Sequence, residues 1–469
     1  MISSRISQLT STKKVEALDA NTDREALLNF TSMVSDPLKA LSGWNSNSSH
    51  CTWFGVSCTK GDNRVSSLSL AELGLSGATI PPQLSNLSSL EVLNLFNNSF
   101  YGQIPKEFSQ LTLLQHIILA TNKISGTIPV GLSQCYGLKV IRLEHNQLTG
   151  HLPPELGNLS RLEFLDVSLN NLTSIIPPTF GNLTSLTYLA LARNQLIGNI
   201  PNELGFLRNL HDLQLSENQF TGKIPNSISN MSSLVFLSLT DNDLSGELPT
   251  DMWTSLQKIF LANNRLEGLI PGSLSNASQI QELDLSSNNF KGTLPLLGKM
   301  KNLVKLHLGI NNLSSTTELN LQVMNSLSNC TQLEYLMLNS NRLTGELPSS
   351  VVNLSTHLKV FRVDDNFLTG EIPSSIGKLQ QLQVFMAQGN RFSGPVPEIF
   401  DNLTRLVVLT LGYNQFSGRI PMSIGNRQHL GTLGLPGNRL DGSIPKEIFG
   451  LPNLRKLYLA QNILSGSLC

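Results

Sequence analysis

One pattern of apolar and polar positions recurs along nearly the whole chain. Residues 90–105 read LEVLNLFNNSFYGQIP and residues 210–225 read LHDLQLSENQFTGKIP, and both fit L-x-x-L-x-L-x-x-N-x-L-x-G-x-I-P. Within x-x-L-x-L, leucines alternate with variable positions, which predicts a short strand with its leucines on one side. A single strand of this kind cannot bury its leucines, whereas stacked copies share a continuous core. The pattern therefore predicts an α/β repeat solenoid with one parallel sheet.

An asparagine follows the predicted strand in almost every copy. A degenerate copy with Leu73 at this position comes first, so the chain contains 17 copies. An amide at this point can satisfy backbone groups where the chain bends, and its repetition predicts a buried asparagine ladder. We assign these residues to the scaffold. They are Asn98, Asn122, Asn146, Asn170, Asn194, Asn218, Asn242, Asn264, Asn288, Asn311, Asn341, Asn366, Asn390, Asn414, Asn438 and Asn462.

The G-x-I-P end of each copy identifies the type of repeat. Proline, as at Pro105 and Pro129, prevents regular strand pairing from continuing, and the preceding glycine permits a bend. The form L-x-G-x-I-P resembles the plant-type leucine-rich repeat. This resemblance implies a second short strand in each copy and a right-handed superhelix with the parallel sheet on its concave face.

A segment at residues 22–64 is suited to cover the first layer of the core. We expect residues 1–21 to form a poorly ordered tail and residues 65–469 to form the repeats. Asp23 is the predicted N-cap of a short amphipathic helix that carries Ala26, Leu27 and Phe30. Trp44 and Trp53 supply large apolar area to the same segment.

The five cysteines fall into three groups. Cys51 and Cys58 flank Trp-Phe-Gly-Val, a pattern that resembles the N-terminal cap of plant receptor kinases, in which the two cysteines pair. A metal site would need further ligands, and only His50 is near. Cys135 and Cys330 occupy matching places in two copies, and we expect two buried, unpaired thiols. Cys469, the last residue, receives no role.

Thirteen N-x-S/T sequons are candidate glycosylation sites. Many follow from the wording of the repeat itself, yet together with the cap cysteines they favour an extracellular glycoprotein. The asparagines are Asn29, Asn47, Asn86, Asn97, Asn158, Asn171, Asn182, Asn230, Asn276, Asn312, Asn329, Asn353 and Asn402.

The period of the repeat breaks at one place. The step from Asn311 to Asn341 is 30 residues instead of 24, and the insert lies in residues 314–333. The irregular copy at 311–341, followed by N-L-S-T-x-L at 353–358, resembles the subfamily of flagellin-sensing, elongation-factor-sensing and rice blight-resistance receptor kinases. The resemblance implies a ligand-binding ectodomain that acts in plant innate immunity, with a co-receptor kinase docking beside the C-terminal repeats.

Charge and chemistry narrow the function classes. With 33 basic and 33 acidic side chains, the chain has no electrostatic footprint for nucleic acid. No apolar run approaches 18 residues, no signal peptide is readable, and no kinase motif occurs. The eight histidines form no metal-binding spacing, so we expect no catalysis, cofactor or metal. Because the chain ends within the last copy, we expect a truncated receptor. The resemblance implies that the parent receptor lies at the extracellular face of the plasma membrane, and we expect this chain to be secreted or mislocalised.

The variable positions around the strand leucines form columns on the concave face, where a peptide or protein ligand would bind. The favoured region comprises copies 8–13, and copies 3–7 are the rival. The favoured residues are Phe236, Lys258, Phe260, Lys305, His307, Tyr335, Met337, Arg362, Asp364 and Asp365. The rival residues are His116, Arg142, Phe164, Tyr188, Arg193 and Asp212.

Two other functions fit the same repeat. Polygalacturonase-inhibiting proteins, which are secreted inhibitors of microbial cell-wall hydrolases, share the repeat and the cap but have about half as many copies. A receptor for a developmental peptide hormone is the second alternative, because the repeat alone does not separate it from an immune receptor.

Overall fold

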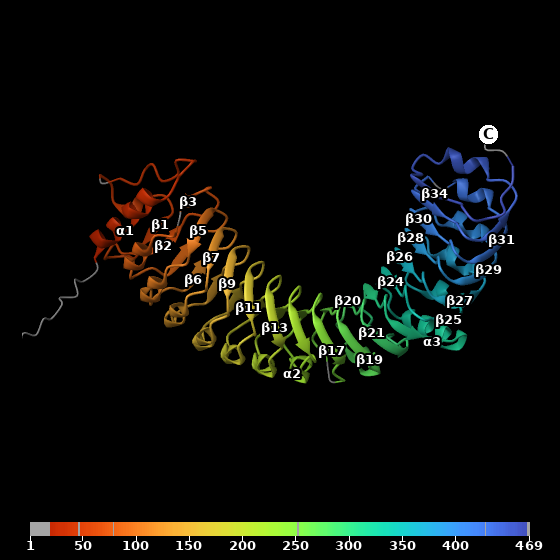
Figure 1. Ribbon diagram of the computed structural model, residues 1–469, viewed down its shortest axis with the longest axis horizontal. Coiled ribbons are helices and arrows are strands. Elements are labelled where there is room, and N and C mark those ends of the chain that lie inside the picture. Colours follow the sequence, from red (N-terminus) through yellow and green to blue (C-terminus); the bar gives the residue numbers. More distant parts are fainter. Residues whose placement is uncertain (1–18, 46, 78, 251–252, 427, 467–469) are drawn as a thin grey trace, which may run out of the picture. The chain divides into compact units, whose positions relative to one another are not determined.

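The computed structural model describes residues 19–45, 47–77, 79–250, 253–426 and 428–466. Most of the predicted N-terminal tail, and Cys469, lie outside these residues. The chain forms two compact units, Met1–Leu148 and Thr149–Cys469, and leucine-rich copies are present in both (Figure 1).

Two strands occur in a typical repeat. In the first unit the first strands of the repeats are β2 (Val65–Ser69), β4 (Val92–Asn94), β6 (His116–Ile118) and β8 (Val140–Arg142). Strand β1 (Val56–Cys58) precedes them in the cap and pairs antiparallel with β2. The first strands of the second unit are β10 (Phe164–Asp166), β12 (Tyr188–Ala190), β14 (Asp212–Gln214), β16 (Phe236–Ser238), β18 (Lys258–Phe260), β20 (Glu282–Asp284), β22 (Lys305–His307), β24 (Tyr335–Met337), β26 (Val360–Arg362), β28 (Val384–Met386), β30 (Val408–Thr410), β32 (Thr432–Gly434) and β34 (Lys456–Tyr458).

The second strands follow each bend. They are β3 (Ser76–Gly77), β5 (Ser99–Gln103), β7 (Lys123–Gly126), β9 (Gln147–Gly150), β11 (Asn171–Ser174), β13 (Gln195–Asn199), β15 (Gln219–Gly222), β17 (Asp243–Glu247), β19 (Arg265–Leu269), β21 (Asn289–Thr293), β23 (Asn312–Ser314), β25 (Thr344–Glu346), β27 (Phe367–Gly370), β29 (Arg391–Pro395), β31 (Gln415–Arg419) and β33 (Arg439–Asp441). These strands confirm the two-strand repeat that the plant-type pattern implies.

Helices are few and mostly a single turn long. The α-helices are α1 (Ala20–Met33), α2 (Asn226–Ser229) and α3 (Thr317–Leu327). The 3-10 helices are η1 (His50–Thr52), η2 (Pro82–Asn86), η3 (Lys106–Gln110), η4 (Val130–Gln134), η5 (Pro154–Asn158), η6 (Pro178–Asn182), η7 (Asn202–Phe206), η8 (Gly272–Asn276), η9 (Ser349–Asn353), η10 (Ser374–Lys378), η11 (Glu398–Asn402), η12 (Met422–Asn426) and η13 (Lys446–Gly450).

Parallel pairing of first strands builds the predicted sheet within each unit. In the first unit Val92 lies opposite His116, which lies opposite Val140. In the second unit Leu213 of β14 lies opposite Leu237 of β16, and both side chains are fully buried. Within this unit, Figure 1 shows the first strands β24 to β34 along one side and the second strands β25 to β31 along the other. The alternation of leucines and variable residues therefore separates core from surface as predicted.

The recurring asparagines form the predicted ladder. Asn242 donates from Nδ2 to the carbonyl oxygens of Leu215 and Leu239, each at 3.1 Å, and its Oδ1 accepts from the backbone N–H of Phe220 at 3.0 Å. The side chain thus joins its own repeat to the one before it. Each bend contains backbone groups that no strand partner satisfies, and the amide supplies both a donor and an acceptor to them.

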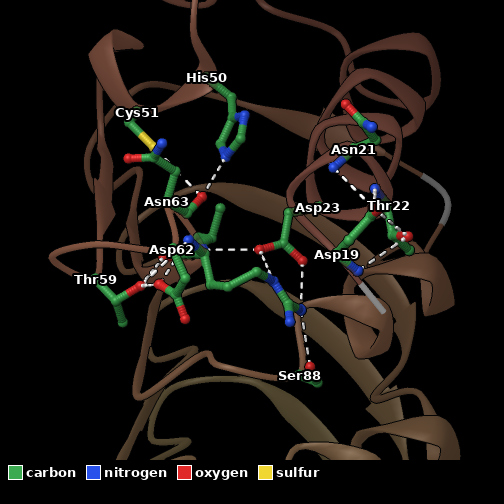
Figure 2. A network of polar contacts seen from close by, with 12 residues as sticks. Asp19, Asn21, Thr22, Asp23, His50, Cys51, Thr59, Asp62, Asn63 and Ser88 are labelled. Carbon is green, nitrogen blue, oxygen red and sulfur yellow. Dashed lines mark hydrogen bonds and ion pairs between the residues drawn. The ribbon is translucent and has the colours of Figure 1, made fainter. Parts of the chain in front are cut away.

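The N-terminal cap differs from the prediction at its first turn. Helix α1 begins at Ala20, before the expected boundary at residue 22, and its N-cap is Asp19, which accepts from the N–H groups of Asn21 and Thr22. The assignment of Asp23 as N-cap is wrong. Asp23 lies inside the helix, fully buried, and accepts from Arg64 Nε and Nη2, both at 2.9 Å, and from the Val65 N–H at 2.8 Å (Figure 2).

These contacts lock the cap onto the first strand of the solenoid. Arg64 also donates to Ser88 Oγ at 2.8 Å, so one guanidinium links the helix to the loop that precedes β4 (Figure 2). The predicted tryptophans stack, with the ring centroids of Trp44 and Trp53 5.3 Å apart. The disulfide between Cys51 and Cys58, which the resemblance to plant receptor caps implies, is present.

The irregular repeat folds as a helix that the sequence pattern did not predict. Helix α3 follows β23, with Thr316 as its N-cap, and buries Val323, Met324 and Leu327. Asn320 Nδ2 donates to the carbonyl oxygens of Thr344 and Glu346 at 2.9 and 3.0 Å. The helix thereby satisfies backbone groups of β25, and the ladder of second strands is interrupted between β23 and β25.

Candidate ligand-binding surface

We define the sheet face as the side of strands β10–β34 that carries the variable residues opposite the buried core. Strand register arranges these residues in two columns. Phe236, Lys258, Glu282, Lys305 and Tyr335 follow one another in the first column. Ser238, Phe260, Asp284, His307, Met337 and Arg362 follow one another in the second. Successive members are about 4.8 Å apart. The register expected from the sequence is confirmed, whereas ligand binding by these residues stays a prediction.

Two aromatic side chains lie on β16 and β18, the first strands of this surface. The rings of Phe236 and Phe260 lie 5.6 Å apart between centroids, across the two columns. Lys305 Nζ lies 6.0 Å from the centroid of the Phe260 ring. Both phenylalanines are half-buried, so the pair offers apolar area beside a positive charge, a combination that is common at protein-binding surfaces.

Asp284 organises the middle of the surface. It is 8% exposed, and its Oδ1 accepts from the N–H and Oγ of Ser286 at 3.1 and 2.6 Å. Its Oδ2 lies 3.2 Å from His307 Nδ1 and 3.4 Å from Lys305 Nζ. Burial alone would raise the pKa of this carboxyl group, but the hydrogen bonds and charge of His307 together with the bonds from Ser286 hold the pKa well below its usual value.

Arg362 is held by a buried partner. Its Nε and Nη2 donate to Asp364 Oδ1 and Oδ2 at 3.0 and 2.8 Å, a bidentate pair in which Asp364 is 1% exposed. Asp364 was expected to face the ligand, but it lies beneath the surface because Arg362 covers it, and it positions that guanidinium. Asp365 is exposed, and desolvation followed by the neighbouring charge of Asp364 raises its pKa.

Further carboxylates neutralise the lysines of this region. Lys258 Nζ lies 2.6 Å from Glu282 Oε1, and Lys359 Nζ lies 2.7 Å from Glu334 Oε2. Sequence reasoning did not select Glu282, Asp284, Glu334 or Lys359 as site residues. Glu282 and Asp284 stand in the same two columns, one repeat away from chosen residues, whereas Glu334 and Lys359 directly precede β24 and β26.

The rival surface is divided between the two units. Phe164 and Tyr188 stack in the second unit with centroids 4.2 Å apart, and Gln214 Nε2 donates to Tyr188 Oη at 3.1 Å. Near this pair, burial raises the pKa of Asp212, and Arg193 pairs with Glu217 at 2.7 Å. His116 and Arg142 belong to the first unit, where Arg142 pairs with Glu144 and lies 5.6 Å from the centroid of the Phe96 ring.

The remaining predicted residues are placed as follows. Cys135 and Cys330 are buried and free, as expected, and desolvation raises the pKa of each thiol to about 11. His50 lies beside Cys51 and Cys58, but the two sulfurs are bonded to each other, so these residues do not offer a thiolate pair to a metal. The sequon asparagines are exposed, except Asn86 and Asn312, which are half-buried.

Stacked leucine strands, an asparagine ladder and a disulfide-bonded cap define a leucine-rich-repeat solenoid. Residues 20–59 match the family described as Leucine rich repeat N-terminal domain, and residues 136–196 match Leucine rich repeat. The description Leucine Rich Repeat further matches residues 89–111, 209–231, 255–277, 279–300, 332–354 and 357–379. Among the described residues, no helix is both long and apolar enough to cross a membrane.

Known proteins place this solenoid among receptors. The plant peptide hormone receptor RGFR1, solved in complex with RGF2, is 33% identical over 89% of this chain and 73% of its own, with a TM-score of 0.80. The Arabidopsis receptor kinase HAESA, solved with the peptide hormone IDA and the co-receptor SERK1, is 29% identical over 95% of this chain and 91% of its own, with a TM-score of 0.61. The chain belongs to the family of plant leucine-rich-repeat receptor ectodomains.

A relative in sequence is the LRR receptor-like serine/threonine-protein kinase EFR of Arabidopsis thaliana. It is 47% identical over 81 residues, which is 17% of this chain and 8% of the relative. The match thus spans a small part of the relative's length.

Proposed function

We propose that this chain is the ligand-binding ectodomain, or a truncated form, of a plant receptor kinase that recognises a peptide in innate immune signalling. The observation that carries the proposal is the surface formed by β16–β26, where aromatic, methionine and arginine side chains occupy adjacent positions in two registered columns. Such residues dominate the energetics of protein recognition, and their spacing suits an extended peptide.

Three observations support the receptor part of the proposal. RGFR1 and HAESA were solved with peptide hormones, and both align with most of this chain. The disulfide in the cap favours an oxidising compartment, in keeping with the extracellular face of the plasma membrane. Eleven of the thirteen sequon asparagines are exposed, so glycans at these eleven positions would not disturb the core.

The immune part rests on the irregular repeat and on similarity to EFR. The alternative, a receptor for a developmental peptide hormone, is favoured by the similarity to RGFR1 and HAESA. HAESA was solved with both the peptide hormone IDA and the co-receptor SERK1, and we infer that this chain also binds a co-receptor kinase, at the C-terminal repeats that the sequence resemblance implies.

Binding to two peptide libraries tests the proposal. The secreted, glycosylated chain is screened against peptides from microbial surface proteins and against secreted plant peptides. A triple variant, Phe260→Ala, Tyr335→Ala and Arg362→Gln, should weaken binding of any hit by at least about 100-fold, because these side chains are expected to contact the peptide. Glutamine at 362 retains a donor for the buried Asp364 carboxylate.

The matched control is a second triple variant on the rival surface, Phe164→Ala, Tyr188→Ala and Arg193→Gln. It removes the same kinds of side chain and should change binding by no more than about threefold. Loss of binding in the control with retention in the first triple variant would reject the assigned surface. Hits from the plant library alone would replace the immune role with a developmental one.

A further inference from the structure

Basic side chains on the sheet face have carboxylate partners in one part of the second unit and not in another, among the residues that the structure describes. In strands β18–β26 and the residues just before them, Lys258, Lys305, Lys359 and Arg362 each lie within 3.4 Å of a carboxylate oxygen. Near strands β30–β34, Arg405, His429, Arg455 and Lys456 have no carboxylate partner among the residues that the structure describes. All four are exposed, and the two arginines and the lysine give this edge uncompensated positive charge.

A missing side chain opens a gap among these cations. The residues directly before strands β28 to β34 form a column in which the N–H of Val407 donates to Gln383 at 2.8 Å, that of Gly431 to Val407 at 2.8 Å, and that of Arg455 to Gly431 at 2.9 Å. Val407 and Arg455 are therefore two strands apart, about 10 Å. Gly431 lies between them and leaves the gap open.

Gly431 forms part of the wall of a recess in the surface. A volume of about 460 Å³ is lined by Val407, His429, Thr432, Arg455 and Lys456, together with Gly431 and Asn453. A second volume of about 490 Å³ shares Val407 and His429 with the first and is bounded by Gln383 and Arg405. The two volumes adjoin, and neither lining contains a carboxylate among the described residues.

We propose that this basic recess binds carboxylate side chains of an acidic peptide segment. Two arginines and a lysine supply positive charge, and the fork of a guanidinium donates two parallel hydrogen bonds to one carboxylate. Val407 and the methyl group of Thr432 offer apolar contact to the short stem of a glutamate. The recess adjoins strands β30–β34, so a peptide lying along the sheet face would reach it.

That the recess binds an anion follows from its own residues. That this anion belongs to a peptide and not to an acidic polysaccharide rests on the proposed function. Because these side chains are exposed, their mutual repulsion is largely screened, and their donors and positive potential remain available to an external anion. The size of the recess fits one or two side chains.

Fluorescence anisotropy with two labelled peptides tests this inference. The probe is an octapeptide of four Glu-Gly units, and the reference is its Gln-Gly analogue. We expect the glutamate peptide to bind at least about tenfold more tightly, because charge-assisted hydrogen bonds to carboxylates are lost in the amide. Its affinity should also fall as salt is raised from 50 to 200 mM, by about tenfold. Equal binding of both peptides would overturn the inference.

Gly431→Glu is the decisive variant. A Cβ at this position meets its nearest atoms at 3.6 and 3.7 Å, which is ordinary contact, so the side chain can be added without strain. The new carboxylate fills and neutralises the recess, and we expect binding of the glutamate peptide to fall by at least tenfold. Gly431→Ala is the matched control and should retain binding. Unchanged affinity in Gly431→Glu would reject the recess as the site.

Two further arms separate the alternatives. Arg391→Gln removes an exposed cation that packs on Phe367 at 5.2 Å, away from the recess, and should leave affinity unchanged. Oligogalacturonate of equal charge should bind more weakly than the peptide, and tight binding sensitive to Gly431→Glu would assign the recess to a polysaccharide instead. The triple variant at Phe260, Tyr335 and Arg362 should bind the octapeptide normally, so failure here is distinguishable from failure of the proposed function.

Discussion

Two parts of one sheet use charge in opposite ways. On β18–β26, each lysine or arginine that we assign to the surface is neutralised by a carboxylate from the same or a neighbouring repeat. On β30–β34 and the residues before them, the cations have no such partners within the described part of the chain, and glycine occupies positions 431 and 434. Both parts have parallel strands with the same spacing, and both bury apolar strand residues, such as Leu283 in β20 and Leu409 in β30.

The comparison teaches that the scaffold and its surface are separable. Each repeat contributes the same core contacts, whereas the variable positions decide whether a region is internally satisfied or left for an external partner. A region whose charges are neutralised would recognise its partner by shape and by contacts with aromatic side chains. A region with uncompensated positive charge would recognise a partner of opposite charge.

The largest effect is expected from removing one ladder asparagine in each part, which tests whether the ladder stabilises both parts to the same extent. Asn288→Ala and Asn438→Ala each remove a buried amide that donates to two or more carbonyls and accepts one backbone N–H. Each should lower the free energy of unfolding by about 3 kcal/mol, because buried backbone groups lose their partners. Urea unfolding measures both. Asn289→Ala, at the exposed neighbouring position, is the control, and a large difference between the two buried sites would break the comparison.

A somewhat smaller effect is expected at Asp364. Asp364→Ala leaves the partly buried guanidinium of Arg362 without its carboxylate and should cost about 2–3 kcal/mol in the free energy of unfolding. The double variant Asp364→Ala with Arg362→Leu should recover part of this loss. If the single variant unfolds at the same urea concentration as the parent, the charges of β18–β26 are not structural.

Acid should weaken β18–β26 through Asp284. Because the pKa of this carboxyl group is lower in the folded chain than the ~3.9 of an unfolded aspartate, its contribution to stability is complete above that value. The contribution is lost progressively as the pH falls from about 4 through the folded pKa. Urea midpoints between pH 5 and pH 2 should therefore decline more steeply in the parent than in Asp284→Asn, and equal slopes would contradict the assignment.

The smallest effect is expected on the uncompensated side. Arg455→Gln with Lys456→Gln should change the free energy of unfolding by less than about 0.5 kcal/mol, since both side chains are exposed and form no ion pair with any described residue. The same double variant should reduce binding of the Glu-Gly octapeptide by roughly tenfold. Marked destabilisation would show that these cations serve the fold, and the contrast between the two regions would then disappear.

Several features were predictable because they repeat. The alternation of leucines predicted the first strands, the spacing of asparagines predicted the ladder, and the register of the columns followed from counting. Helix α3 was missed because the insert occurs once, so no periodicity marks it, and its helix is fixed by Thr316 at the N-cap and by Asn320 bonding to Thr344 and Glu346. Asp23 was misassigned because helix caps are common at Asp, whereas its true partner, Arg64, is 41 residues away.

The sequence by itself determined the repeat, the direction in which each leucine points and the columns of variable residues, because these depend on local spacing that recurs many times. The tertiary structure alone decided which charges are neutralised, that Asp364 lies beneath Arg362, and that Gly431 opens a recess among cations. These outcomes depend on contacts between side chains of different repeats and on burial, and both arise only when the strands stack at a fixed spacing.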